Sequence, residues 1–548
     1  MPAPITHNTL FYGDNLPILR DYIAAGSVDL VYLDPPFNSN RTYNVLFKQE
    51  SGEGAESQIA AFEDTWHWNQ AAEFTYFQLI ENAPAHVAQM IGALRGFIGE
   101  NQMMAYLVMM AARLVELHRV LKPTGSLYLH CDPTASHYLK IVMDTIFGPH
   151  QFINEIIWKR TTAHSSSKKF APIHDTILYY GKTATVVWND ARADYDPEYL
   201  DKYYRFDDGD GRLYWRDNLC AAGVRKGSSG KPWRGIDPGA KGMHWKYTVE
   251  KLDELDAQGR IYWPPKGTMP QYKRYRDELK GKAIPDIWDD IDRINPVGSE
   301  RLGYPTQKPL ALLERILQAS SNPGDVVLDP FCGCGTTIAA AQKLGRRWIG
   351  IDITHLSISL QKYRLKEMFG DDLGFQVIGE PEDVAGARQL ARDDKYQFQW
   401  WALSLIRAKP LGGEAGSKTG KKGADKGIDG IITFADDESG AAKRVIVQVK
   451  SGHVGRPAVG ELVGTVQREG AAIGVFVTLE EPTGPMLAEA AAAGFYQSAK
   501  MGHVYPRIQI LTIAQLLAGA QVQMPSVTQT FKKAQRVKEV GAEQGRLL

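Results

Sequence analysis

The sequence has few cysteines, no net charge and no long apolar run, and each shortage excludes a class of protein. Its 548 residues include only 4 cysteines, at positions 131, 220, 332 and 334, which form no disulfide or zinc framework. No apolar stretch is long enough to span a bilayer, and no basic segment with an apolar core stands at the N-terminus. A GxxxxGK[ST] phosphate loop is also missing, so an ATP-driven motor of that type is not encoded. These absences predict a cytoplasmic protein with no membrane partner.

The charge balance and the length set two further bounds. Lys and Arg together number 63, as do Asp and Glu, so any binding of nucleic acid must use local basic patches. With 548 residues, of which 44% are hydrophobic and 23% charged, the chain is globular and too long for one ordinary core. We therefore expect two or three domains.

The tetrapeptide Asp34-Pro35-Pro36-Phe37 follows an apolar run, residues 28–33, that predicts a buried strand. Because two prolines cannot continue a sheet ladder, the acid and the aromatic residue are fixed at the carboxyl end of that strand, where open α/β sheets bind ligands. Asp34 and the Pro35 carbonyl can accept the two hydrogens of a nucleobase amine and so localise its lone pair. Phe37 offers a face for stacking a base that has been flipped out of a duplex. A strand end followed by a Pro-Pro turn explains these four residues equally well.

A second strand end lies far downstream, in residues 322–337. This segment reads as a strand ending at Asp329, a loop of small residues and a helix that begins near Thr336. Gly333 and Gly335 would let the backbone approach a ligand closely. The loop is not GxGxxG, and it suits a cofactor without a pyrophosphate better than a dinucleotide.

The next strand after this loop ends at Asp352. Its spacing from Asp329 is close to the roughly 20 residues expected for a carboxylate that binds ribose hydroxyls. Cys332 and Cys334 in the loop raise the alternative of a metal pair, but small side chains in a glycine loop explain them better. The segment therefore predicts a nucleotide-type cofactor site.

Three motifs, in this order, resemble those of the β-class amino DNA methyltransferases, which act on adenine N6 or cytosine N4. They are Asp34-Pro35-Pro36-Phe37, Tyr304-Pro305-Thr306-Gln307-Lys308-Pro309 and Asp329-Pro330-Phe331 with Gly333 and Gly335. The resemblance covers about residues 8–380. It implies a Rossmann-like α/β fold with a seven-stranded, mostly parallel sheet in permuted order. It also implies S-adenosyl-L-methionine as methyl donor and an exocyclic amine of double-stranded DNA as acceptor.

The resemblance also implies roles for single residues. Asp34, Pro35, Pro36 and Phe37 would be catalytic. The positions carried over as cofactor contacts are Asp14, Lys308, Asp329, Pro330, Phe331, Gly333, Gly335, Thr336 and Asp352. For Asp14, a role as helix N-cap is nearly as good an explanation. Members that methylate cytosine N4 more often carry Ser where Asp34 stands, so adenine N6 is the preferred target and cytosine N4 the alternative.

Regular periodicity fails between about residues 190 and 300, where basic and aromatic residues crowd together. From Arg212 to Lys246 there are eight basic and two acidic residues, interleaved with Trp215, Trp233 and Trp245. A second basic and aromatic patch contains Lys266 and residues 272–276. Cations for phosphates and flat side chains for bases favour an irregular target-recognition region. A solvated charged face is the alternative.

A second candidate site lies beyond a boundary near residues 380–383. Residues 427–434 and 445–450 predict two strands that place Asp429, Gln448 and Lys450 on one face. Hydrolysis of a phosphodiester needs a divalent cation held by oxygens and a positive charge near the attacking water. About residues 395–520 resemble the Mrr-type form of the PD-(D/E)xK restriction endonuclease core, in which Gln replaces an acid. The resemblance implies Mg²⁺ held by Asp429 and Gln448, with all three residues catalytic.

One departure from the nuclease family concerns the preceding helix. That family usually carries a Glu there, whereas Gln397 and Gln399 stand here, so a degenerate DNA-binding module is the alternative to an active endonuclease. The predicted domains are a methyltransferase (1–380), a linker (381–394), a nuclease-like domain (395–520) and a polar tail (521–548). Together they predict an enzyme of a restriction-modification system that acts on double-stranded DNA, with a homodimer allowed.

Overall fold

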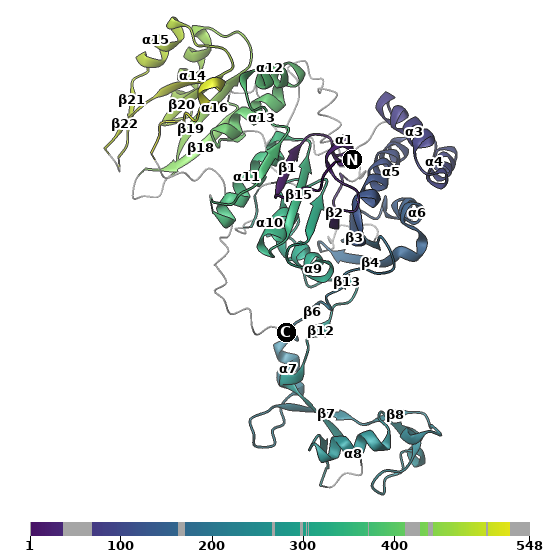
Figure 1. The fold of residues 1–548 in the computed structure, drawn as a ribbon. Helices are drawn as coiled ribbons and strands as arrows, with labels where there is room; N and C mark the ends of the chain where they lie inside the picture. Colours follow the sequence, from purple (N-terminus) through teal and green to yellow (C-terminus); the bar gives the residue numbers. More distant parts are fainter. Residues whose placement is uncertain are drawn as a thin grey trace. The chain divides into compact units, whose positions relative to one another are not determined.

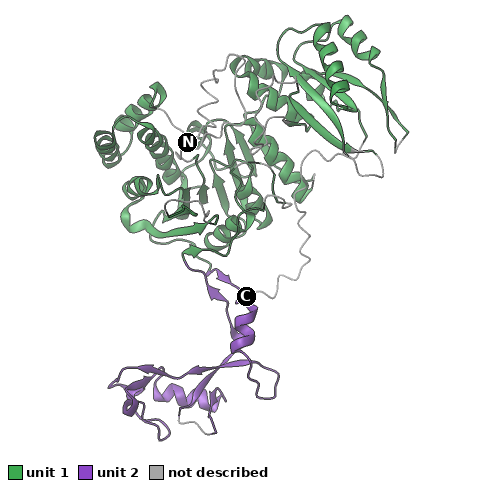
Figure 2. Cartoon of the chain, turned by 180° about the vertical axis from the view of Figure 1, so that it is seen from behind, with its two compact units in different colours: residues 1–189, 286–539 green, residues 190–285, 540–548 purple. Residues whose placement is uncertain are grey.

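The computed structural model divides the chain into two compact units. One comprises residues 1–189 and 286–539, and the other residues 190–285 and 540–548 (Figure 2). Within these units the structure describes residues 2–36, 68–162, 170–265, 269–295, 300–302, 304, 306–370, 372–410, 428–436, 442–499 and 502–525. Phe37, Lys266 and all but the first residues of the predicted tail lie outside the described residues.

A mostly parallel sheet forms the centre of the larger unit (Figure 1). In the described residues it has nine strands in the order β13-β4-β5-β3-β2-β14-β15-β1-β16. The strands are β1 (Thr9–Tyr12), β2 (Val28–Leu33), β3 (Leu121–Cys131), β4 (Phe152–Lys159), β5 (His174–Gly181), β13 (Ile287–Trp288), β14 (Val326–Asp329), β15 (Arg347–Asp352) and β16 (Gln376–Ile378). The predicted count of seven was wrong because the short strands β13 and β16 extend the two edges.

Strands that are distant in sequence lie next to each other in this sheet. β14 pairs in parallel with β2, with Leu328 opposite Val31, and with β15 on its other side. Every residue of β2 and β14 is buried, as expected for parallel strands covered on both faces by helices. The carboxyl ends of β2, β14 and β15 therefore meet at one edge of the sheet, where both predicted motifs begin.

Helices α1 (Asn15–Tyr22), α3 (Gln70–Asn82), α4 (Ala85–Ile98), α5 (Gln102–Val120), α6 (Ser136–Phe147), α9 (Leu310–Ser320), α10 (Thr336–Lys343) and α11 (His355–Phe369) belong to this unit. Asn101 caps the start of α5, since its side chain accepts a hydrogen bond from the Met104 N–H. Met104, Met109 and Met110 are buried and fill the core beside this helix.

A second sheet in the larger unit has the order β17-β18-β19-β20-β23. Its strands are β17 (Lys409–Pro410), β18 (Gly430–Ala435), β19 (Ala442–Lys450), β20 (Ile473–Thr478) and β23 (Ile508–Thr512), and the hairpin β21 (Phe495–Gln497) and β22 (Val504–Pro506) accompanies it. Helices α13 (Lys395–Leu405), α14 (Arg456–Arg468), α15 (Gly484–Ala492) and α16 (Ile513–Leu517) complete the domain. The predicted linker contains helix α12 (Val384–Asp393), whose Ala387 and Ala391 pack into the core of this domain.

The smaller unit has a hydrophobic core of its own. Its elements are α7 (Pro197–Tyr203), α8 (Val249–Ala257), the sheet β10 (Ile261–Tyr262), β11 (Gln271–Tyr275) and β7 (Tyr214–Asn218), and the pairs β8 (Cys220–Ala222) with β9 (Met243–Trp245) and β6 (Arg192–Ala193) with β12 (Lys282–Ala283). Trp233 and Trp245 are 2% and 0% exposed and pack against Leu219 and Leu252. The expectation that these two tryptophans contact DNA bases was therefore wrong, because they hold this core together.

Candidate functional site

Asp34 follows the last residue of β2, and its carboxylate forms an ion pair with the ammonium group of Lys308. Both side chains are largely buried, at 15% and 11% exposure. Pro35 is buried and Pro36 is partly buried beside them. Phe37, the fourth predicted catalytic residue, lies outside the described residues. The pairing brings the first predicted motif against the second.

Tyr304, in the same segment as Lys308, lies against the glycine loop. A methyl group added at Gly333 would come within 3.1 Å of the Tyr304 ring. The Tyr304 hydroxyl is also 3.4 Å from the Ser357 Oγ atom on α11. The short segment from Tyr304 to Lys308 thus contacts the glycine loop at one end and Asp34 at the other.

The loop after β14 depends on glycine at two positions. Gly333 has φ +50° and Gly335 has φ +75°, a left-handed conformation that glycine adopts without strain. At Gly335, a Cβ atom would lie 2.7 Å from the Gln361 side chain. Only glycine therefore allows this approach of the loop to α11.

Asp329 and the residues after it form hydrogen bonds and packing contacts with neighbouring parts of the protein. Asp329 Oδ1 accepts a hydrogen bond from the Phe331 N–H at 3.0 Å, and Phe331 packs against the core around β2. The Pro330 carbonyl accepts one from Asn15 Nδ2 at 2.7 Å. Thr336 is buried, and its Oγ1 atom accepts a bond from Arg364 at 3.0 Å. These four residues shape the loop, and the side chains of Asp352 and Gln361 hydrogen-bond to the Gly333 backbone.

Asp352 ends β15 and holds two turns together. Its Oδ2 atom accepts a hydrogen bond from the Gly333 N–H at 2.9 Å, and Oδ1 accepts from the N–H and the hydroxyl of Thr354 at 2.9 and 3.0 Å. These bonds use three of the about four acceptor sites of a carboxylate, and the Ser357 hydroxyl also acts on this group. Burial raises the pKa of Asp352 to about 6 and that of Asp329 to about 7.

Asp14 serves as the N-cap of α1, which was the alternative left open above. Its Oδ1 atom accepts hydrogen bonds from the Leu16 N–H and from Arg113 Nη2, both at 2.8 Å. Asn15, which no sequence pattern singled out, connects this turn to the Pro330 carbonyl. The first strand is therefore tied to the glycine loop through Asn15 and not through Asp14.

A row of buried polar side chains starts at Tyr32, two residues before Asp34, and was not predicted from the sequence. The Tyr32 hydroxyl is 2.9 Å from His130 Nδ1, and His130 Nε2 is 3.2 Å from Asp175, which also pairs with Arg160 at 3.0 Å. Burial would raise the pKa of Asp175, but the hydrogen bond from His130 and the nearby cations lower it below its usual range. Period-two alternation from Asp34 back to Tyr32 is the signal that could have found this row.

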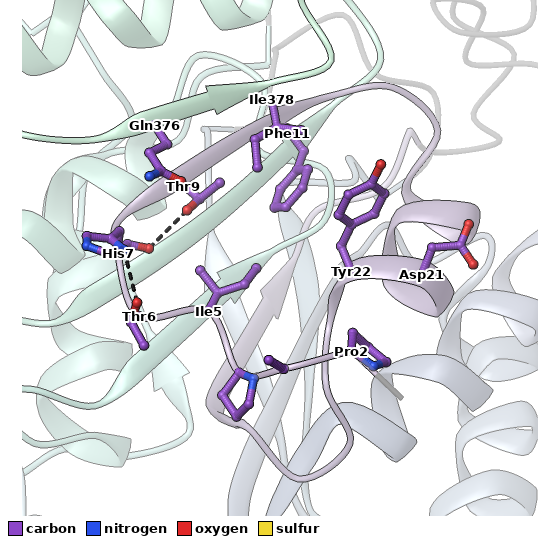
Figure 3. Close-up of a pocket in the computed structure, with 12 residues that line it drawn as sticks. Pro2, Ile5, Thr6, His7, Thr9, Phe11, Asp21, Tyr22, Gln376 and Ile378 are labelled. Atoms are coloured by element: carbon purple, nitrogen blue, oxygen red, sulfur yellow. Dashed lines mark hydrogen bonds between the residues drawn. The ribbon is translucent and has the colours of Figure 1, made fainter.

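A pocket of about 330 Å³ lies beside β1 and β16, the last two strands at one edge of this sheet (Figure 3). Phe11, Tyr22 and Ile378 line it together with the first residues of the chain. It contains none of the predicted site residues, so the pocket is separate from the cluster around Asp34 and Asp352.

The second candidate site lies at one end of β18 and β19. Gly430 pairs with Val447 in these antiparallel strands, which places Asp429 opposite Gln448. Asp429 Oδ2 accepts a hydrogen bond from the Val449 N–H at 2.7 Å. Gln448 is buried, and Lys450, the last residue of β19, is partly exposed. The three predicted residues therefore lie together.

Of the two glutamines on the preceding helix, Gln397 is buried and Gln399 is partly exposed. Gln397 Oε1 accepts a hydrogen bond from the His355 N–H at 3.0 Å, so this side chain is turned toward α11 and not toward Asp429. Among the described residues, no group of three or more His, Cys, Asp or Glu side chains could hold a metal ion. Asp429 and Gln448 fit only an Mg²⁺ ion whose remaining ligands are water and DNA phosphate.

No helix in the described ranges is long and apolar enough to cross a membrane.

Comparison with known proteins assigns both parts of the chain. Residues 28–360 match the N6/N4 family model described as DNA methylase, and residues 390–501 match one described as restriction endonuclease. The type II methyltransferase M.EcaI of Enterobacter cloacae is 40% identical over 249 residues, which are 45% of this chain and 54% of that protein. The Mod subunit of the type III restriction-modification enzyme StyLTI of Salmonella typhimurium is 27% identical over 359 residues, which are 62% of this chain and 50% of that protein.

The chain thus spans about half the length of these two relatives. Among solved structures, the cytosine-N4-specific PvuII DNA methyltransferase aligns with 12% identity and a TM-score of 0.33, covering 66% of this chain and 88% of that one. The DNA methylase match covers more than half of the sequence and includes Asp34, Lys308 and the glycine loop. The chain therefore belongs to the N6/N4 DNA methylase family and carries a restriction endonuclease-like domain at residues 390–501.

Proposed function

We propose that the chain transfers a methyl group from S-adenosyl-L-methionine to an exocyclic amine of a base in double-stranded DNA. The observation that carries this proposal is the segment from Tyr304 to Lys308, which contacts both the glycine loop and Asp34. Two motifs separated by almost 300 residues of sequence thereby become neighbours at one sheet edge. Methyl transfer by direct displacement requires this proximity of donor and acceptor sites.

In the proposed reaction the Asp34 carboxylate and the Pro35 carbonyl accept hydrogen bonds from the two N–H groups of the target amine. An ionised carboxylate only accepts hydrogen bonds, which suits this role. Lys308 supplies the opposite charge that a largely buried carboxylate needs. Because a carboxylate has about four acceptor sites, the amine of an entering base can donate to Asp34 while the Lys308 ion pair keeps the carboxylate in place.

The residues around the glycine loop fit the methyl donor. Asp352 would accept from a ribose hydroxyl, and the left-handed conformations of Gly333 and Gly335 let the loop backbone come close to a ligand. The bound cofactor would supply the electrophilic methyl group. Asp329 accepts from the Phe331 N–H and so also supports the turn that would bind the cofactor.

We further propose adenine N6 as the target, in preference to cytosine N4. The support is the Asp at position 34, where members that act on cytosine N4 more often carry Ser. For target recognition we propose the smaller unit. Many of its cations are already paired, as are Arg212 with Asp277 and Arg274 with Asp217. Exposed Arg225 and Lys226 are better placed to contact phosphates.

The experiment that tests this function is a methyl-transfer assay. DNA is incubated with S-adenosyl-L-methionine labelled in the methyl group, using the wild-type protein and Asp34→Ala. We expect label in DNA with the wild type and at least about a hundredfold less with the variant, since the amine is no longer polarised. Equal incorporation by the two proteins would refute the assignment of Asp34.

We also propose that the C-terminal domain cleaves DNA in the presence of Mg²⁺, as part of a restriction-modification system. The specific observation in favour is that Asp429, Gln448 and Lys450 lie together at one end of β18 and β19. A bound Mg²⁺ ion would polarise the phosphodiester, and Lys450 would stand near the attacking water. The alternative is a domain that binds DNA without cleaving it.

Nicking of a supercoiled plasmid separates these two possibilities. The wild type is compared with Lys450→Ala, which removes the ammonium group but leaves the Asp429 contact to the strand intact. Mg²⁺-dependent nicking that is lost in the variant supports an endonuclease. Equal nicking by both proteins would contradict the assignment of Lys450, and no nicking by either with DNA binding retained supports the binding module.

A further inference from the structure

The turn that follows Asp352 is held from outside the methylase domain. Thr354 and His355 begin helix α11, and the first N–H groups of a helix have no partner within it. The His355 N–H is one of these groups, and it donates to Gln397 Oε1 at 3.0 Å. Gln397 lies in the first turn of α13, which belongs to the restriction endonuclease-like domain.

This contact is fully enclosed. His355 is 0% exposed and Gln397 5% exposed, so water cannot replace the glutamine as acceptor. Leu356, the next residue of α11, packs against the hydrophobic core of the C-terminal domain. α11 and α13 are neighbouring helices of the same compact unit (Figure 1). A buried N–H that loses its partner is unfavourable, so the fold is expected to keep this bond.

The His355 side chain connects the start of α11 to the first strand, β1. It stacks on Tyr12 with ring centroids 3.6 Å apart, and Tyr12 lies opposite Asp352 in the pairing of β1 with β15. Glu380 approaches His355 Nδ1 at 3.7 Å and also pairs with Lys362. Burial lowers the pKa of His355, so the ring is neutral at pH 7.

Between Gln397 and the proposed ribose site there are therefore only two linked residues. Gln397 fixes the His355 backbone, and Thr354, directly before it, donates twice to Asp352. Asp352 in turn accepts the Gly333 N–H of the glycine loop. Each step is a hydrogen bond or a shared peptide link, so a shift of α13 must move the Asp352 carboxylate.

We propose that Gln397 is a positioning residue for the methyl donor and that the restriction endonuclease-like domain is a structural part of the cofactor site. The proposal rests on the proposed methyl-transfer function. Gln397 does not touch the cofactor; it fixes the turn that carries Asp352. Because linkage is reciprocal, cofactor binding must stabilise the docking of α13 by the same factor by which α13 strengthens cofactor binding.

The test uses Gln397→Leu, which keeps the size of the side chain but removes the acceptor. Gln389→Leu is the matched control, since Gln389 is exposed on α12 and bonds Asp393 and Arg392 within its own helix. Binding of S-adenosylhomocysteine, the demethylated product, is measured by calorimetry on the full chain. We expect the Kd to rise about tenfold in Gln397→Leu and to stay within about twofold in the control. In methylation assays the KM for S-adenosyl-L-methionine rises while kcat at saturation is retained.

A measurement on the wild type covers the case in which Gln397→Leu fails to fold. Hydrogen exchange of the first turn of α13 is followed with and without S-adenosylhomocysteine, and we expect slower exchange with it. Unchanged Kd in Gln397→Leu, or unchanged exchange in α13, would overturn the positioning role alone. A wild type that binds no S-adenosylhomocysteine would instead contradict the proposed function.

Discussion

Lys308 and Asp34 stand 274 positions apart in the chain and form an ion pair at the edge of the central sheet. The pair exists because β2 and β14 are neighbours, although almost the whole methylase domain separates them in sequence. It joins the residue proposed to polarise the target amine to the segment that contacts the glycine loop.

Replacing Lys308 should lower the rate of methyl transfer more than cofactor binding. In Lys308→Met the Asp34 carboxylate loses its counter-charge and its orientation in a largely buried position. We expect kcat to fall by about 10² and the Kd for S-adenosylhomocysteine to change by less than about threefold. Lys308→Arg should recover part of the rate. A loss of cofactor binding as large as the loss of rate would place Lys308 at the cofactor instead.

Cofactor affinity should depend on pH through Asp352. Its pKa in the free protein is raised to about 6, and ribose hydroxyls donate to the ionised form. Affinity for S-adenosylhomocysteine should therefore be constant above pH 7 and fall as the pH drops through 6, by up to about tenfold per pH unit. Calorimetry between pH 5 and 8 measures this dependence. In Asp352→Asn the affinity should be weaker and this pH dependence should disappear.

The same group has the opposite effect on the stability of the free protein. An unfolded Asp titrates near about 3.9, so between that pH and 6 the folded protein binds a proton that the unfolded chain does not. The contribution of Asp352 to stability is thus present at low pH and is lost as the pH rises through 6. Urea unfolding of the wild type and Asp352→Asn across this range should show their difference growing with pH.

Gly335→Ala should destabilise the methylase domain more than an ordinary glycine replacement. The residue has φ +75°, and its Cβ would lie 2.7 Å from the Gln361 side chain, which must move. We expect the free energy of unfolding to fall by about 2 to 3 kcal/mol. Gly345→Ala is the control, because Gly345 has φ +71° but its Cβ would meet only Pro323 at 3.9 Å. That change should cost about 1 kcal/mol. Equal losses at the two sites would show that the approach to Gln361 is not tight.

Trp245→Ala should unfold the smaller unit and abolish sequence-specific methylation. The side chain is 0% exposed, and its indole N–H donates to the Lys231 carbonyl at 3.0 Å. Removing a buried tryptophan costs about 3 to 5 kcal/mol. Trp188→Ala is the control, since Trp188 is 57% exposed. Near-ultraviolet circular dichroism and limited proteolysis report the unfolding. If Trp245→Ala lost DNA binding while the smaller unit stayed folded, the result would support stacking of Trp245 on a DNA base.

Local patterns in the sequence were enough to predict most of the sheet and the order of its motifs. The apolar run before Asp34 and the strand that ends at Asp329 were both predicted from the sequence pattern, and both are strands in the structure. Such features depend on residues close together in the chain, so a window of sequence contains the information. The short edge strands β13 and β16 carry too few residues to show a period.

Contacts between distant residues could not be read in this way. Nothing local distinguishes Gln397, which reaches α11, from Gln399, and both were equal candidates for the nuclease site. Composition was also misleading for Trp233 and Trp245, because a tryptophan among cations suggests a nucleic-acid surface until burial is known. For Asp14 both roles were open, and the contact to Leu16 shows the capping role.

The central claim is that Asp34 and the glycine loop form one site for methyl transfer to a DNA amine. Its most direct test is mass spectrometry of nucleosides from DNA treated with S-adenosyl-L-methionine and wild-type protein, Asp34→Ala or Asp352→Ala. The account predicts N6-methyladenine with the wild type, a loss at any cofactor concentration with Asp34→Ala, and partial recovery at high cofactor concentration with Asp352→Ala. A methylated amine formed equally by all three proteins, or no methylated amine with the wild type, would contradict it.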